Sequence, residues 1–192
     1  DGAVPAGALA CEPMADEALR RAQALAALVP AAVRADEAYD LLRGPAGAIV
    51  PLLRLSATDG DSRWTMTATA IGEHLRAAAR PAGGAADGDP GLWWPGPFAT
   101  DGLGGLSHGA TGIGWALSHL DGCDDLAAAA FRYEESLYDP GLPGWLDMRK
   151  PERPTDAAAW CHGAIGIGLV AADRWRGASD PATRDHWADV LR

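Results

Sequence analysis

Apolar residues recur at helical spacing in short stretches that glycine and proline separate. In the first stretch, leucines at positions 19, 25 and 28 stand among alanines, with Arg20 and Arg21 opposite them, which predicts an amphipathic helix. The pattern predicts helices over residues 15–29, 32–40, 45–53, 64–79, 110–120, 124–137, 164–175 and 181–191. Pro30 is expected to end the first helix, and Pro51 to kink the third.

Residues 81–97 are too rich in Gly and Pro for regular structure and predict a long loop, and residues 139–141 predict a turn. Nothing alternates with the period of a strand for more than a few residues, so the chain is predicted to be all-α.

An internal repeat indicates how these helices are arranged. His108-Gly-Ala-Thr-Gly-Ile-Gly114 matches His162-Gly-Ala-Ile-Gly-Ile-Gly168 at six of seven positions, 54 residues further along the chain. Arg43-Gly-Pro-Ala-Gly-Ala-Ile49 is a weaker third copy that shares the two outer glycines. A repeat of this length that holds two helices is typical of stacked helical hairpins. Each copy places Gly-x-x-Gly where a loop enters a helix, so the helix entries converge on one rim if the hairpins curve. We therefore expect an α/α toroid, present as an incomplete arc; a plain helical solenoid is the alternative.

Composition narrows the classes of function. The chain has 192 residues and a formal net charge of -10, so the backbone of a nucleic acid is not an expected partner. It contains no apolar run near the ~20 residues that span a bilayer, and its start does not have the pattern of a signal peptide. Three cysteines are too few for a disulfide framework and fit a reducing cytoplasm. Cys11 and Cys123 are expected to be ordinary apolar residues.

The candidate chemistry gathers at the helix entries. Cys161 precedes one of them, where the positive end of the helix dipole favours a thiolate, although a lone cysteine is more often a small buried apolar residue. His108 and His162 occupy equivalent positions of two copies, whereas a single histidine would more often be structural. Asp40 places a short carboxylate near the same rim; its alternative role is capping. The other three histidines lie in ordinary helical stretches and are expected to be structural.

Four elements resemble the cyclase domain of class II lanthipeptide synthetases, which has the LanC-like fold. They are the segments 107–117 (Ser-His-Gly-Ala-Thr-Gly-Ile-Gly-Trp-Ala-Leu), 133–139 (Tyr-Glu-Glu-Ser-Leu-Tyr-Asp), 145–149 (Trp-Leu-Asp-Met-Arg) and 160–168 (Trp-Cys-His-Gly-Ala-Ile-Gly-Ile-Gly). The segment 39–47 is similar to the early Asp-x-x-x-Gly-x-x-Gly element, and the resemblance spans about residues 15–175. It implies that Cys161 is a zinc ligand, that His108 is an acid/base and that Asp40 orients it. It also implies that His162 is a possible proton donor.

The sequence departs from this family at two places. The arginine that some members carry four residues before the zinc cysteine is Ala157 here. No second Cys-His-Gly, which completes the family's zinc site, follows Cys161. We therefore expect residues 1–192 to be a partial cyclase domain, with two zinc ligands in C-terminal repeats beyond Arg192. The resemblance also implies a dehydratase domain upstream.

The resemblance implies an enzyme that adds cysteine thiols of a precursor peptide to dehydroalanine or dehydrobutyrine, with Zn²⁺ as cofactor. The chain as given is expected to lack this activity. Three alternatives remain open. One is glutathione addition to dehydrated residues on the same architecture, and another is a peptide-binding scaffold without zinc. The third, a carbohydrate enzyme with an α/α toroid, would need paired carboxylates, for which Asp40 and Asp101 are the candidates.

Overall fold

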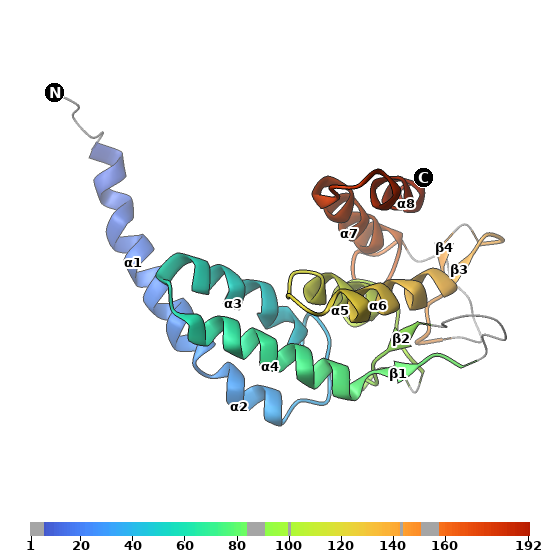
Figure 1. Cartoon of the computed structure of the whole chain (residues 1–192), viewed down its shortest axis with the longest axis horizontal. Helices are drawn as coiled ribbons and strands as arrows, with labels where there is room; N and C mark the ends of the chain where they lie inside the picture. The colour runs from blue at the N-terminus through green and yellow to red at the C-terminus, as the bar shows by residue number, and fades with distance from the viewer. Residues whose placement is uncertain (1–5, 84–90, 100, 143, 151–157) are drawn as a thin grey trace.

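Helices form more than half of the chain in the computed structural model, which describes residues 6–83, 91–99, 101–142, 144–150 and 158–192. Figure 1 shows them in chain order. The helices are α1 (Ala6–Ala26), α2 (Val29–Arg34), α3 (Ala46–Asp59), α4 (Ser62–Ala78), α5 (Ala110–Leu117), α6 (Asp124–Ser136), α7 (Ala164–Gly177) and α8 (Pro181–Val190). The all-α prediction is confirmed.

Helices α3 to α8 form three consecutive hairpins. The most extensive packing between helices is within the pairs α3/α4, α5/α6 and α7/α8. Helix α5 also contacts both α3 and α7, so the first helix of each hairpin packs against its counterpart in the next one. Each of these first helices begins within one Gly-x-x-Gly copy. The predicted arc of helical hairpins is therefore present, and its three helix entries lie along one side.

Aliphatic side chains of the first two hairpins form the centre of the core. They are almost completely buried and come from α3, α4 and α5: Ile49, Leu52, Ile71, Leu75, Ile113 and Leu117. Burying a side chain of this size contributes roughly 1.5–3 kcal/mol relative to leaving it exposed. This core fixes α5, and with it the loop that carries His108.

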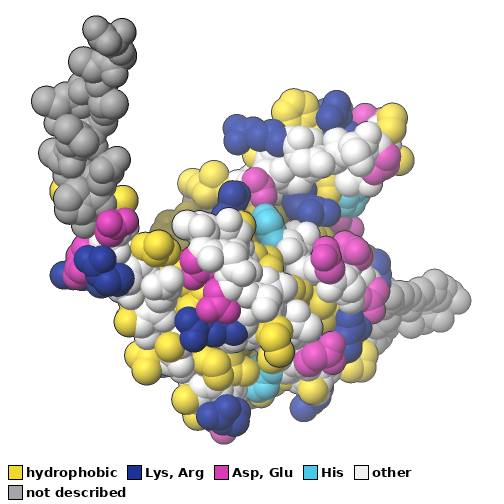
Figure 2. Space-filling view, turned by 60° about the vertical axis from the view of Figure 1, so that its left-hand side comes forward, with side chains coloured by type: hydrophobic (Ala, Val, Ile, Leu, Met, Phe, Trp, Pro, Cys, Tyr) yellow, Lys and Arg dark blue, Asp and Glu magenta, His cyan; other side chains and the backbone are white. Residues whose placement is uncertain are grey.

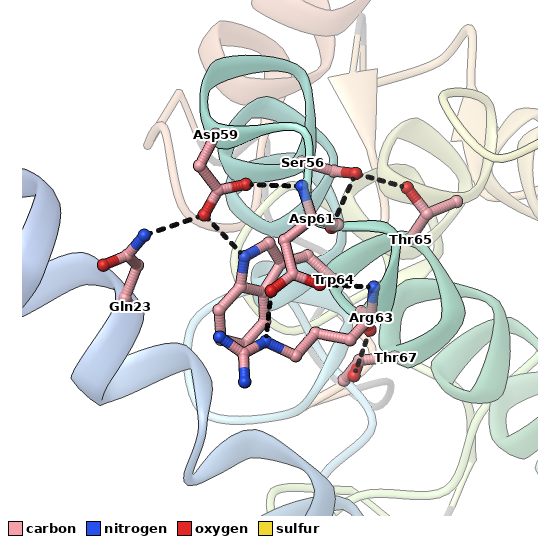
Figure 3. A network of polar contacts seen from close by, with 8 residues as sticks. All are labelled: Gln23, Ser56, Asp59, Asp61, Arg63, Trp64, Thr65 and Thr67. Atoms are coloured by element: carbon pink, nitrogen blue, oxygen red, sulfur yellow. Dashed lines mark hydrogen bonds and ion pairs between the residues drawn. The ribbon is translucent and has the colours of Figure 1, made fainter.

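Polar contacts at the turn between α3 and α4 attach helix α1 to the first hairpin (Figure 3). Gln23 of α1 and the Trp64 indole each donate to the Asp59 carboxylate at 2.9 Å. The turn itself depends on Gly60, whose φ of 75° is left-handed and ends α3. Asp61 then accepts a hydrogen bond from the Arg63 amide and caps α4.

The structure corrects several predicted boundaries. Helix α1 begins at Ala6 rather than near residue 15, and Pro30 lies in the first turn of α2 instead of ending a helix. Proline is compatible with either position: it cannot continue a preceding helix, and the first turn of a helix does not need the N–H that proline lacks. Helix α2 ends at Arg34, so the prediction of a helix to residue 40 was wrong. Helix α3 continues through Pro51 to Asp59.

Two short hairpins were not predicted. Strand β1 (Arg80–Pro81) pairs with β2 (Leu92–Trp93), and β3 (Tyr138–Asp139) pairs with β4 (Gly144–Trp145), both antiparallel. The first lies partly in the segment expected to be irregular. In the second, the predicted turn at residues 139–141 starts at the last residue of β3 and continues into the turn that follows it. At two residues each, the strands leave the fold class unchanged.

The surface carries charges of both signs. Figure 2 shows basic and acidic side chains interspersed on one face of the molecule. Within the described part of the chain, no helix combines the length and the apolar character that crossing a membrane would require.

Candidate functional site at the helix entries

Hydrogen bonds between equivalent backbone positions hold the three helix-entry loops side by side. The Leu42 amide donates to the Ser107 carbonyl at 3.1 Å, and the Ser107 amide donates to the Cys161 carbonyl at 3.0 Å. These three residues each precede the variable position of a copy, which is Arg43, His108 or His162. The three loops therefore lie next to one another in the order of the copies, and the three variable positions are neighbours.

The second glycine of each copy is required by a close backbone approach. A Cβ at Gly47, Gly112 or Gly166 would lie 2.0, 1.9 or 1.9 Å from the carbonyl oxygen six residues earlier. Three copies with the same approach confirm that the weak first copy is a structural repeat of the other two.

Asp40 is buried at the rim and uses its two carboxylate oxygens differently. Its Oδ1 accepts hydrogen bonds from the amides of Leu42, Arg43 and Gly44 at 3.0, 2.6 and 3.0 Å. Its Oδ2 lies 2.7 Å from Nδ1 of His108, which is 68 residues away in the sequence. One oxygen thus fixes the loop, and the other is available to orient the histidine.

His108 has one ring nitrogen committed and the other available. A carboxylate accepts, so its contact with Asp40 places the imidazole proton on Nδ1 and leaves Nε2 able to take or give a proton. No described group hydrogen-bonds Nε2, and a quarter of the side chain is exposed. The ring of Phe98 packs against the imidazole with 4.8 Å between centroids.

Cys161 and His162 are in contact at the entry to α7. The thiol Sγ lies 2.8 Å from Nδ1 of His162, and both side chains are half-buried. Burial lowers the pKa of His162, and the Arg149 guanidinium lowers it further, while Asp147 opposes both. The imidazole is therefore mainly neutral at pH 7.

A small pocket lies between His108 and His162. Its lining includes His108, His162, Asp147 and Arg149 together with Leu103 and Met148. Asp147 and Arg149 form a two-pronged ion pair, with Nε to Oδ1 at 2.8 Å and Nη2 to Oδ2 at 2.5 Å. The hydrogen bonds from Arg149 hold the pKa of Asp147 below its ordinary value. The structure thus brings both predicted histidines to one pocket.

Glu134 of α6 holds the loop that carries His108. Its buried Oε2 accepts from the Gly105 amide at 2.7 Å and from the Thr111 amide at 3.3 Å, at either end of that loop. Thr111 lies in the first turn of α5, whose N-cap residue Gly109 provides no side-chain cap. Burial raises the pKa of Glu134, which the two amides oppose.

Sequence reasoning assigned no role in the site to Glu134, Asp147 or Arg149. A signal existed for the first of them. Glu134 follows Ala127 and Ala130 at helical spacing on the buried stripe of α6, where a charged residue needs a partner. The Trp145–Arg149 segment resembles an element of the family, and this resemblance by itself gives Asp147 and Arg149 no role.

The other sequence candidates take simpler places. Asp101 is exposed, whereas both oxygens of Asp40 are committed, so these two carboxylates do not form an equivalent pair. The thiol of Cys123 is buried in the core. Ala157 lies outside the described residues.

The three histidines expected to be structural have partners away from the pocket. His74 stacks on Tyr39, His119 contacts the Trp115 carbonyl, and His186 pairs with Glu135.

Two neighbouring side chains at the entry to α7 could contribute ligands to a metal ion such as zinc. Cys161 and His162 offer a soft sulfur and a nitrogen, both of which suit zinc. Among the described residues no group of three or more metal-binding side chains occurs, whereas zinc sites use at least three protein ligands. A complete site would need ligands from elsewhere.

The arc of helical hairpins, with a thiol and two imidazoles at its helix entries, has the features expected of the LanC-like class of protein. Comparison with protein families agrees with this class. The model of the family described as "Lanthionine synthetase C-like protein" matches residues 12–188, and the chain belongs to this family. The sequence matched no curated protein and no solved structure.

Proposed function

We propose that this chain is part of a cyclase that forms thioether rings in a dehydrated precursor peptide, of the class II lanthipeptide synthetase type. The observation that carries the proposal is the shared pocket of His108 and His162, with Asp40 oriented onto His108 at 2.7 Å and the Cys161 thiol against His162. Membership of the lanthionine synthetase C-like family supports the same activity.

The reaction adds the S–H of a peptide cysteine across the C=C bond of a dehydroamino acid. The thiol must lose its proton, sulfur bonds to the β-carbon, and the α-carbon gains a proton. Cys161 would hold zinc together with ligands from outside the described residues. When bound, zinc would lower the pKa of the substrate thiol from about 8.5, so that a thiolate exists at neutral pH.

The residues of the chain supply the proton steps. Asp40 holds His108 with Nδ1–H directed at its carboxylate, so Nε2 is the atom that exchanges protons with the substrate. His162, in the same pocket, would deliver a proton to the α-carbon after its imidazole has taken one up, since the resting imidazole is mainly neutral. Because Asp40 is buried and fixed by three backbone amides, His108 does not have to be reoriented during the reaction.

The test uses protein from the complete open reading frame and a dehydrated precursor peptide. Cyclisation consumes thiols, so the mass added by a thiol-alkylating reagent counts the rings that have not formed. His108→Ala should slow thiol consumption by about 100-fold or more, in the range of general acid–base catalysis, and leave the zinc content near wild type. His186→Ala, a histidine away from the pocket, is the matched control. No thiol consumption by the wild-type protein would contradict the proposed function, and loss of zinc in His108→Ala would contradict the role of His108.

A further inference from the structure

Arg149 is the permanent cation of the rim pocket. Among the described residues, the lining of the pocket contains two imidazoles, one carboxylate and one Arg or Lys side chain, that of Arg149. A guanidinium does not release its proton near neutral pH, so Arg149 cannot serve as an acid or base in the reaction. Its chemistry is limited to binding an acceptor or a negative charge.

The ion pair with Asp147 uses only part of the guanidinium. Nε and Nη2 both donate to Asp147, while Nη1 has no acceptor among the described residues. The two-pronged contact fixes the plane of the guanidinium and therefore the direction of the remaining N–H groups. With 38% of its side chain exposed, Arg149 is accessible from solvent.

Arg149 lies near the groups that would react. It lines the same pocket as His108 and His162, and His162 is the residue directly after Cys161.

Addition of a thiolate to a dehydroamino acid creates a negative charge at a defined atom. As sulfur bonds to the β-carbon, the π electrons of the C=C bond move toward the carbonyl, and the carbonyl oxygen becomes an enolate oxygen. Proton transfer to the α-carbon then restores the carbonyl. A preorganised donor at that oxygen is worth more in this transition state than in the bound substrate.

We propose that Arg149 is a further catalytic residue, whose Nη1 binds the carbonyl oxygen of the dehydroamino acid and stabilises the enolate. The inference rests on the proposed function. Asp147 acts as a positioning residue that holds the guanidinium, and the two histidines remain free to move protons.

The test compares Arg149→Met with Arg76→Met in protein from the complete open reading frame. Arg76 is a close match, because its side chain is also 38% exposed and also forms a two-pronged pair with a carboxylate, Asp125, away from the pocket. Arg149→Met should lower kcat for cyclisation by about 100- to 1000-fold, as loss of an oxyanion donor does, with KM changed less than about threefold. Arg76→Met should retain the wild-type kcat, and Arg149→Lys should recover part of the loss.

A second measurement follows the enolate directly. In D₂O, the enzyme should catalyse exchange of the α-proton of the finished thioether ring through the reverse step, and Arg149→Met should slow that exchange in parallel with kcat. The double variant Asp147→Asn/Arg149→Met removes the ion pair without leaving an unpaired carboxylate and should show the same loss.

The outcomes separate the two proposals. An inactive wild-type enzyme would count against the cyclase function. An active wild type with a wild-type kcat in Arg149→Met, or a loss confined to KM, would overturn the role of Arg149 alone. Recovery of kcat in the double variant would also overturn it, because the loss would then come from the Asp147 carboxylate that Arg149→Met leaves unpaired.

Discussion

Replacing Gly166 by alanine should destabilise the chain, while the same change two residues later at Gly168 should not. Both glycines lie within α7, so each substitution gains the helix propensity of alanine, about 1 kcal/mol. They differ in their surroundings. A Cβ at Gly166 would lie 1.9 Å from the Trp160 carbonyl oxygen and 2.8 Å from Cβ of Leu106, whereas none of the described atoms comes within 4 Å of a Cβ at Gly168.

The contact distances set the magnitude. The Trp160 carbonyl would have to move by about 1 Å to reach even the 3.0 Å below which real Cβ contacts essentially never occur. Overpacking of this kind costs typically 1–3 kcal/mol, and more where backbone must shift. After the propensity gain, Gly166→Ala should lose roughly 2 kcal/mol and Gly168→Ala should gain up to about 1 kcal/mol, a difference of about 3 kcal/mol.

Urea unfolding followed by far-ultraviolet circular dichroism measures this difference. With an unchanged slope, the two variants should have unfolding midpoints on opposite sides of the wild type. The Trp160 carbonyl precedes Cys161, whose own carbonyl accepts from Ser107, so Gly166→Ala should also change the rate at which Cys161 is alkylated. Equal midpoints for the two variants would refute the reasoning from close approach.

Three further results are expected. Asp40→Ala leaves three loop amides without their acceptor and should cost about 2–4 kcal/mol in urea unfolding, while Asp40→Asn keeps an acceptor and should mainly slow cyclisation. The hydrogen bond from Arg76 lowers the pKa of Asp125 from 3.8 to about 2. The ionised Asp125 therefore stabilises the folded chain above pH 3.8, and this contribution is lost as the pH falls toward 2. Acid should shift the unfolding midpoint of the wild type more than that of Asp125→Asn. The 192-residue chain should not retain equimolar zinc after dialysis against a mild chelator, measured by metal analysis, because Cys161 and at most one neighbour are too few ligands.

The repeat was sufficient to predict the hairpins, because each Gly-x-x-Gly copy forms the same local structure. In all three copies the second glycine lies against the backbone carbonyl six residues earlier, where a side chain would not fit. Helix limits near proline were less predictable, since Pro30 is compatible with both an end and a first turn, and Pro51 is accommodated inside α3.

Spacing along the chain could pair only those site residues that repeat. His108 and His162 could be paired from their equivalent positions, and the pocket contains both. Asp40 and His108 are 68 residues apart, so their spacing in the sequence could not predict the contact between them. The resemblance to the family implied it. Glu134 and Arg149 belong to no repeat, and their roles depend on how α6 and the segment after β4 pack against the loops.

The carboxylates that accept hydrogen bonds from the first two helix-entry loops explain how His108 comes to lie beside Asp40. A glycine-rich helix entry exposes several amides that need acceptors once they are buried. In the first copy Asp40 supplies the acceptor from within the loop, and in the second copy Gly105 stands at the equivalent position while Glu134 supplies the acceptor from α6. The second loop therefore needs no carboxylate of its own beside His108. Oδ1 of Asp40 accepts all three hydrogen bonds from its own loop, so Oδ2 is available to His108 in the neighbouring loop. Stability and orientation of the proposed acid/base are thus coupled through one side chain, and only a substitution that keeps Oδ1, such as Asp40→Asn, can separate them.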